Sequence, residues 1–128
     1  MRLVKFRGKN LQLNKWVYGN LIIDQTHNRI FIHDGYVGDS MEVNCVEVHP
    51  ESVGQFTGLY DINGQEIYEG DIVKLKWTIS IYTAKVVFKE GMFCVVGDYA
   101  LHSFWNTSFD TPPKIKILGN VFDNPELL

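Results

Sequence analysis

The densest group of reactive side chains in the sequence is acidic and lies between residues 61 and 71. Asp61, Glu66, Glu69 and Asp71 could supply a carboxylate pair for acid–base catalysis, or oxygen ligands for Mg²⁺. Aspartate and glycine are also typical of tight turns, where the Asp side chain accepts hydrogen bonds from the following backbone. We expect Asp61 and Asp71 to serve in turns, and Glu66 and Glu69 to face solvent. The group therefore predicts no catalytic and no metal site.

Histidine and cysteine do not form a recognisable site either. The four histidines show none of the close spacings typical of zinc sites. Cys45 and Cys94 are isolated, and we expect them to be small apolar fillers in a reducing compartment. Motifs of the Gly-x-Ser-x-Gly and phosphate-loop kinds are absent from the sequence. The sequence therefore predicts no catalytic residue and no cofactor.

Basic and aromatic residues alternate near the N-terminus, before the first acidic residue, Asp24. Basic groups follow phosphates and aromatic rings stack on unpaired bases, so this stretch supports a nucleic-acid hypothesis. The candidate contact residues are Lys5, Arg7, Lys9, Lys15, Trp16 and Tyr18.

Further lysines alternate with apolar residues in the second half of the chain. Lys74, Lys76 and Lys85 would extend the basic surface if their strands adjoin, as would the lysines at 89, 114 and 116. Alternating lysines also keep a sheet face soluble and an edge strand unpaired, so both interpretations stay open. Trp105 lies among aromatic and polar residues, where it could cover the core or contact a protein partner.

The elements that must position these residues belong to one small domain. The chain has 128 residues, of which 45% are hydrophobic and 21% charged, with a formal net charge of −3. This composition is that of a globular protein, and its small net charge favours no particular partner. No apolar run is long enough to cross a membrane, and no signal peptide is evident. We expect a cytoplasmic protein without a membrane partner.

Short β-branched and aromatic runs separated by turn residues predict a mostly β fold with little helix. Three runs alternate with a period of two, which places lysines on one face and apolar residues on the core face, so we expect their strands to share a sheet. The expected strands are Leu3–Phe6, Trp16–Ile23, Arg29–His33, Val46–Val48, Asp71–Trp77, Tyr82–Phe88, Met92–Val96 and Lys114–Val121.

Turn chemistry predicts the connections. Asp61-Ile62-Asn63-Gly64 is typical of a tight turn, and Lys89-Glu90-Gly91 of a hairpin. Gly70 supplies a backbone angle that a residue with a Cβ resists, immediately before a strand. Residues 49–52 predict a brief helical turn, and Asn124 before Pro125 predicts a capped one.

Three ordered blocks of residues resemble the YopX-like proteins of bacteriophages and prophages. The first block is Lys5-Phe6-Arg7-Gly8-Lys9 with Trp16-Val17-Tyr18-Gly19. The second runs from Gly54-Gln55-Phe56-Thr57-Gly58-Leu59 to Glu69-Gly70-Asp71-Ile72-Val73, and the third is Gly119-Asn120 with Asn124-Pro125-Glu126-Leu127-Leu128. The stretches 24–47 and 78–111 match only in being β-like.

The resemblance implies a single domain with an N-terminal β lobe, about residues 1–57. A small SH3-like β-barrel, about residues 58–128, would form around the Gly-Asp-Ile-Val strand, and the origin would be a phage or prophage. The resemblance carries no activity and no catalytic residue. Its structural motif consists of Gly58, Asp61, Gly64, Gly70 and Asp71.

Plentiful turn chemistry and missing catalytic motifs lead to the hypothesis of a non-enzymatic binding or assembly module. Its partner is not specified by the sequence and could be a second copy of the chain, or a phage or host protein. The first alternative is a nucleic-acid-binding accessory protein that uses the basic N-terminal strand and the lysine-rich β face. The second alternative is an enzyme acting on a small metabolite.

Overall fold

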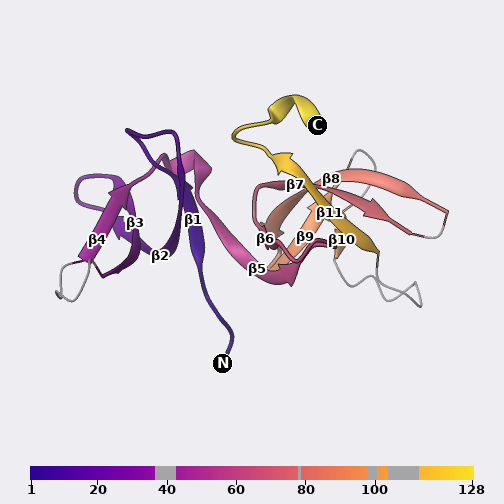
Figure 1. The fold of residues 1–128 in the computed structure, drawn as a ribbon, viewed down its shortest axis with the longest axis horizontal. Helices are drawn as coiled ribbons and strands as arrows, with labels where there is room; N and C mark the ends of the chain where they lie inside the picture. The colour runs from indigo at the N-terminus through magenta and orange to yellow at the C-terminus, as the bar shows by residue number, and fades with distance from the viewer. Residues whose placement is uncertain (37–42, 78, 98–100, 104–112) are drawn as a thin grey trace. The chain divides into compact units, whose positions relative to one another are not determined.

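The structure is a computed structural model that describes residues 1–36, 43–77, 79–97, 101–103 and 113–128. Nearly all of the regular structure in these ranges is antiparallel strand, and the helical parts are two single turns, η1 (Pro50–Ser52) and η2 (Pro125–Leu127) (Figure 1). The mostly β fold with little helix is confirmed. Within these ranges, no helix has the length and apolar character that crossing a membrane requires.

The chain divides into two compact units, Met1–Phe56 and Thr57–Leu128. The first unit contains β1 (Phe6–Lys9), β2 (Trp16–Asp24), β3 (Arg29–Tyr36), β4 (Val43–Glu47) and the start of β5 (Gly54–Tyr60). These strands are hydrogen-bonded in the order β4-β3-β2-β1-β5. Ile32 and Val48 are buried in this unit. A Cβ at Gly8 would lie 2.7 Å from Cγ2 of Val48, so only glycine fits at this position of β1.

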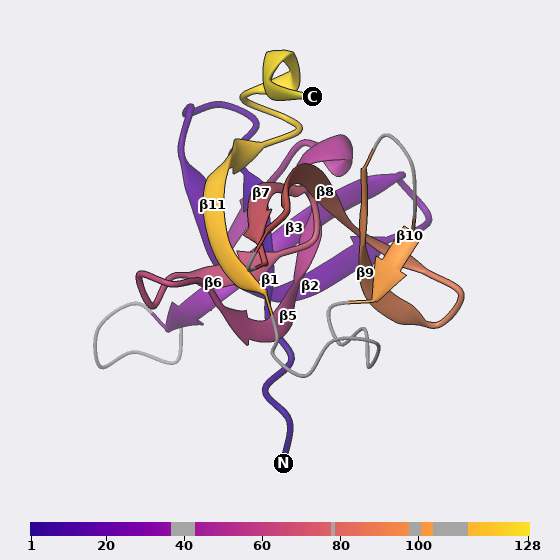
Figure 2. The same ribbon diagram turned by 90° about the vertical axis from the view of Figure 1, so that its right-hand side faces the viewer.

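The second unit contains the end of β5, β6 (Glu66–Tyr68) and a five-stranded sheet. The sheet consists of β7 (Asp71–Lys76), β8 (Ile81–Lys89), β9 (Met92–Val96), β10 (Leu101–Ser103) and β11 (Lys114–Asn120). The strand order is β10-β9-β8-β7-β11, and Figure 2 shows β11 and the β9–β10 pair at opposite edges. The prediction that the three lysine-bearing strands belong to one sheet is confirmed.

One face of this sheet forms the core of the second unit. Val73 and Leu75 from β7, Ala84 and Val86 from β8, and Val95 from β9 are buried there together with Ile67. Trp77, Ile115 and Ile117 pack against this cluster. The period-two alternation therefore predicted the core side chains of β7 and β11 correctly. On β8 it was right for Ala84 and Val86, but Tyr82 and Phe88, which were expected on the same core face, are exposed.

Asp61 organises the turn between β5 and β6. Its Oδ1 accepts hydrogen bonds from the backbone N–H groups of Asn63 (2.8 Å) and Gln65 (2.9 Å), and its Oδ2 accepts one from Ile117 of β11 (3.2 Å). Burial alone would raise the pKa of Asp61, but these hydrogen bonds and the nearby Lys116 lower it below its ordinary value. The predicted tight turn is confirmed.

Two other predicted connections are confirmed by their backbone angles. Gly70 has a φ of 93° immediately before β7, in the left-handed region that glycine tolerates best. The β8–β9 hairpin turns through Glu90 (φ 54°) and Gly91 (φ 78°). The brief helical turn expected at residues 49–52 is present as η1.

Several strand predictions were wrong in position. The first strand is Phe6–Lys9 rather than Leu3–Phe6, because its pairing with β2 runs from Phe6↔Gly19 to Lys9↔Trp16. β5, β6 and β10 lie in stretches where no strand was expected. Gly54 and Gly58 interrupt the alternation in β5, and β6 and β10 are only three residues long, so pairing with neighbouring strands outweighs weak local preferences.

The structure corrects three side-chain expectations. The Asn124 side chain does not cap η2; its Oδ1 instead accepts a hydrogen bond from the Asn120 N–H (3.3 Å). Cys45 is exposed on β4 and not an apolar filler, whereas Cys94 is buried, and burial raises the pKa of its thiol. Glu66 and Glu69 are half-buried rather than solvent-facing.

The SH3-like barrel is not confirmed. In the described residues, the five-stranded sheet has two ends, β10 and β11, and its pairing does not close into a barrel. The coarser arrangement, two antiparallel sheets, is what the strand order establishes.

Candidate functional site

Lys5 and the two basic residues of β1 lie beside aromatic rings. Cζ of Arg7 lies 4.7 Å from the ring centroid of Trp16, and Nζ of Lys9 lies 5.2 Å from the same centroid. Nζ of Lys5 lies 5.6 Å from the centroid of Phe56. The register explains this, because antiparallel pairing places Arg7 opposite Tyr18 and Lys9 opposite Trp16. The structure thus gathers three of the six predicted N-terminal candidates, Arg7, Lys9 and Trp16, into one cluster.

This cluster is poorly placed to contact phosphates. Arg7 is only 7% exposed and Lys9 only 6%, so neither cation presents a free surface to a large ligand. A cation over an aromatic ring is stabilised by about 2 kcal/mol when it is desolvated, which offsets part of the cost of burying it. Tyr18 and Lys15 are exposed. The interpretation of Arg7 and Lys9 as accessible nucleic-acid contacts therefore needs correction.

Four lysines in the second unit form a block on the sheet face opposite the core. The register of β7 with β11 places Lys76 directly opposite Lys114, and Lys74 directly opposite Lys116. All four side chains are exposed. Opposite residues on paired strands are about 5 Å apart, and residues two apart on one strand are about 7 Å apart. We call Lys74, Lys76, Lys114 and Lys116 the lysine block.

The charges of the lysine block are close together and largely uncompensated. None of its lysines forms an ion pair within the part of the chain that the structure describes. Lys116 lies close enough to the buried Asp61 carboxylate to lower its pKa. Like charges directly opposite each other on paired strands destabilise a sheet, so this arrangement has a cost in stability.

Protection of a sheet edge explains only half of the lysine block. β11 is an edge strand, where lysines discourage pairing with another chain. β7 is a central strand, paired on one side with β8 and on the other with β11. Lys74 and Lys76 therefore have no edge to protect. Their exposure on this face indicates that they either keep the face soluble or bind a ligand.

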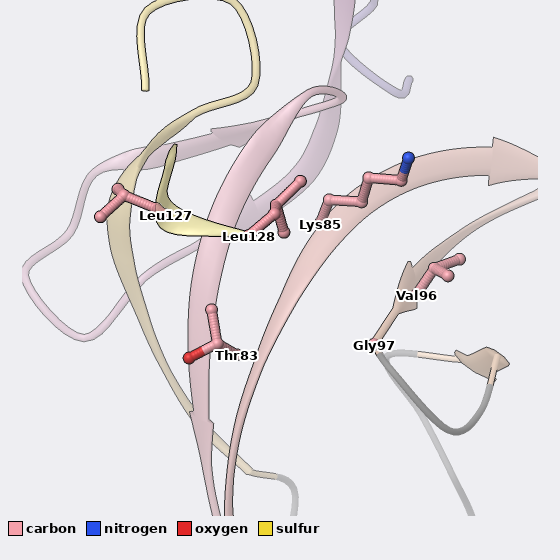
Figure 3. A pocket seen from close by; sticks show the side chains of 6 residues that line it. All are labelled: Thr83, Lys85, Val96, Gly97, Leu127 and Leu128. Atoms are coloured by element: carbon pink, nitrogen blue, oxygen red, sulfur yellow. The ribbon is translucent and has the colours of Figure 1, made fainter. Parts of the chain in front are cut away.

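A groove of about 300 Å³ lies on the same face of the sheet. Figure 3 shows the side chains that line it: Thr83 and Lys85 from β8, Val96 from the end of β9, and Leu127 and Leu128 from the C-terminal turn. Thr83 is directly opposite Lys74 in the β7–β8 register. The groove thus adjoins the lysine block, and the half-buried Lys85 adds a further cation.

The acidic residues between positions 61 and 71 do not form one site, and the contacts that they make are structural. Asp71 is 1% exposed and its Oδ2 accepts a hydrogen bond from the Tyr68 N–H (2.8 Å), while Asp61 holds the β5–β6 turn. A Glu66 carboxylate oxygen lies 3.4 Å from the Tyr68 hydroxyl. In the described ranges, no three His, Cys, Asp or Glu side chains come together as a metal site would require.

The remaining predicted residues are scattered. Gly58, Gly64 and Gly70 all have positive φ and shape the backbone of the second unit. Trp105 lies outside the described residues. Sequence analysis did not identify Thr83, Leu127 and Leu128 as neighbours of the lysines, because only strand register and the path of the C-terminal turn bring them together.

Comparison with known proteins gives one family and a common fold. The family model described as "YopX protein" matches residues 5–128. The crystal structure of protein EF1440 from Enterococcus faecalis has a TM-score of 0.64 and 22% identity, covering 100% of this chain and 99% of that one. The crystal structure of protein yopX from Bacillus subtilis has a TM-score of 0.58 and 21% identity, covering 100% and 97%. No curated protein matches the sequence.

Proposed function

The chain belongs to the YopX family, and on this premise we propose that it is a non-enzymatic module that binds nucleic acid through the lysine block. Neither structural neighbour is named for an activity or a ligand, so the support comes from the geometry of this chain. The observation that carries the proposal is the direct opposition of Lys74 with Lys116 and of Lys76 with Lys114. A phosphate backbone would relieve this repulsion, because each phosphate carries a negative charge.

The ligand class follows from the distribution of charge. The chain has a net charge of −3, so attraction of a polyanion depends on a local basic surface. The lysine block supplies four exposed cations from two neighbouring strands, and Lys85 extends them towards the groove. The phage or prophage origin and the cytoplasmic location are part of the same proposal, since a nucleic-acid-binding accessory protein would act there.

Duplex backbone is a better ligand for this surface than single strands. Proteins that bind single strands without sequence preference stack the bases on exposed aromatic rings. Among the described residues, the lysine-bearing face of β7, β8, β9 and β11 carries no aromatic side chain. We therefore expect contacts to phosphates alone, with little dependence on base sequence.

The proposal is tested by titrating a fluorescent duplex with the protein at about 0.1 M salt and measuring anisotropy. Lys74→Gln/Lys76→Gln should weaken binding by roughly tenfold for each lysine, because each removes one phosphate contact. The control variant Lys15→Gln/Lys89→Gln removes two exposed lysines outside the block and should bind nearly as the wild type does. Equal loss in both variants, or no loss in either, would overturn the proposal.

A further inference from the structure

The β7–β8 hairpin ends in an apolar tip beside the lysine block. Ile79 is 96% exposed and Ile81 is 57% exposed. The backbone N–H of Trp77 donates a hydrogen bond to the Ser80 carbonyl oxygen (2.9 Å), which closes the turn that contains Ile79. Isolated exposed apolar residues are ordinary on protein surfaces, but two such residues at the end of one hairpin form a small apolar patch.

The register joins this tip to the lysines. Ile81 lies directly opposite Lys76, and Lys76 lies directly opposite Lys114 on its other side. Because directly opposite residues point to the same face of a sheet, Ile81 and these two lysines form one row. Lys116, Lys74 and Thr83 form the next row, one pleat further from the tip. The two rows of lysines therefore lie on the same face of the sheet as Ile81, and the apolar tip lies at one end of these rows.

The base of the tip is held in place from the core face. The rings of Trp77 and Tyr82 meet edge to face with centroids 5.7 Å apart. Trp77 also packs against the buried core cluster of the second unit. A side chain that separates stacked bases needs a rigid support of this kind. A flexible hairpin would change its own conformation before the bases unstacked.

We propose that this tip is a wedge: with duplex DNA held on the lysine block, Ile79 inserts between adjacent base pairs and bends the duplex. The inference rests on the proposed function and adds an activity to it. Isoleucine is one of the apolar side chains that DNA-bending proteins insert between base steps, where it partly unstacks them and kinks the duplex by about 20–90°. Ile81 follows Ile79 into the widened step, and Lys76 and Lys114 hold the flanking phosphates.

An anionic membrane surface could also attract lysines and isoleucines, but the arrangement fits DNA better. A membrane would be met by the tip, so the cations would be needed around the tip alone. Here the lysines extend back from the tip in two rows across two strands, as contact with a phosphate backbone lying along the face requires. Charge complementarity along the face thus favours duplex DNA.

The test measures binding and bending separately. A duplex of about 30 base pairs, labelled with a donor and an acceptor at its two ends, reports bending as increased energy transfer, while anisotropy reports binding. The wild type should bind and raise energy transfer. Ile79→Ser and Ile79→Ser/Ile81→Ser should bind within about threefold of the wild type and lose most of that increase. The control Ile23→Ser changes an isoleucine that is also 57% exposed, on β2, and should bend as the wild type does.

The outcomes distinguish this inference from the function it rests on. Wild-type binding without bending, or equal bending by the Ile79 variants, would overturn the wedge and leave the lysine block in place. Failure of the wild type to bind the duplex would overturn both. Co-sedimentation with phosphatidylserine vesicles is the second arm: vesicle binding that depends on Ile79, combined with bending that does not, would assign the tip to a membrane and also overturn the wedge.

Discussion

Arg7 and Lys9 show why a residue type alone does not identify a phosphate contact. Both are basic, as are Lys74 and Lys76, and both alternate along a strand. The first pair is buried against the Trp16 ring, whereas the second pair is exposed and faces other lysines. The side chains around each cation, a ring in one case and other cations in the other, therefore decide between stabilising the fold and attracting a ligand.

Asp61 is the residue whose substitution should destabilise the second unit most selectively. In Asp61→Asn, an amide nitrogen would face one of the backbone N–H groups that now donate hydrogen bonds to Oδ1 and Oδ2. We expect a loss of about 2–3 kcal/mol in the free energy of unfolding, since hydrogen bonds to charged groups contribute strongly. Urea denaturation measures this loss. The exposed Glu126→Gln serves as the control, and an equal effect of the two substitutions would contradict the role of Asp61.

The lowered pKa of Asp61 also predicts a pH dependence. Because the pKa is lower in the folded state, the unfolded state binds more protons as the pH falls below about the ordinary value of 3.8. The stabilising contribution of Asp61 is therefore complete above that value and is lost as the pH falls through the folded-state pKa. The wild type should lose stability over this range more steeply than Asp61→Asn.

Other carboxylates share this sign, so the comparison with Asp61→Asn is necessary. A hydrogen bond with His27 lowers the pKa of Asp24, and one with Arg29 lowers that of Glu47. Both hydrogen bonds remain in Asp61→Asn, so they contribute equally to the dependence of stability on pH in the variant and in the wild type. Parallel curves for the wild type and Asp61→Asn below pH 4 would show that Asp61 does not carry this dependence.

At the scale of elements, β7 combines the core and the candidate site in one strand. Val73 and Leu75 are buried on one face, and Lys74 and Lys76 are exposed on the other. The alternation of residue types predicted this division, because side chains of a strand point to opposite faces in turn. It could not predict which lysines oppose each other, since the β7–β11 register joins segments about 40 residues apart and depends on tertiary packing.

The cost of the lysine block predicts a gain in stability when its repulsion is removed. Lys114→Glu places a carboxylate opposite Lys76 and should raise the free energy of unfolding by about 0.2–1 kcal/mol while weakening duplex binding. Lys89→Glu, at a position opposite Met92, is the control and should change neither quantity substantially. Thermal denaturation and anisotropy provide the two measurements. Lower stability in Lys114→Glu would contradict mutual repulsion within the block.

The elements that sequence analysis missed have weak local signals. β5 contains Gly54 and Gly58, which interrupt the alternation, and β6 has only three residues, too few to show one. β5 also begins in the first unit and ends in the second, so its pairing partners change along its length. Pairing of this kind depends on contacts distant in sequence, which local patterns do not contain.

At the scale of the whole molecule, the family and the basic surface are separate pieces of information. The family match covers residues 5–128, and the likeness to EF1440 and yopX at 22% and 21% identity establishes the fold alone. The net charge of −3 gives no sign of the lysine block, because acidic residues elsewhere in the chain outnumber the basic ones. Local distribution of charge, rather than its total, therefore leads to a nucleic-acid ligand.

The salt dependence of duplex binding tests the central claim most directly. Each phosphate contact contributes about −0.9 to the slope of log affinity against log salt concentration, so four lysines predict a wild-type slope of about −3 to −4. Lys74→Gln/Lys76→Gln/Lys114→Gln/Lys116→Gln should bring the slope close to zero, while Lys15→Gln/Lys89→Gln should leave it nearly unchanged. Absence of duplex binding at low salt, or an unchanged slope in the fourfold variant, would contradict the assignment of nucleic-acid binding to the lysine block.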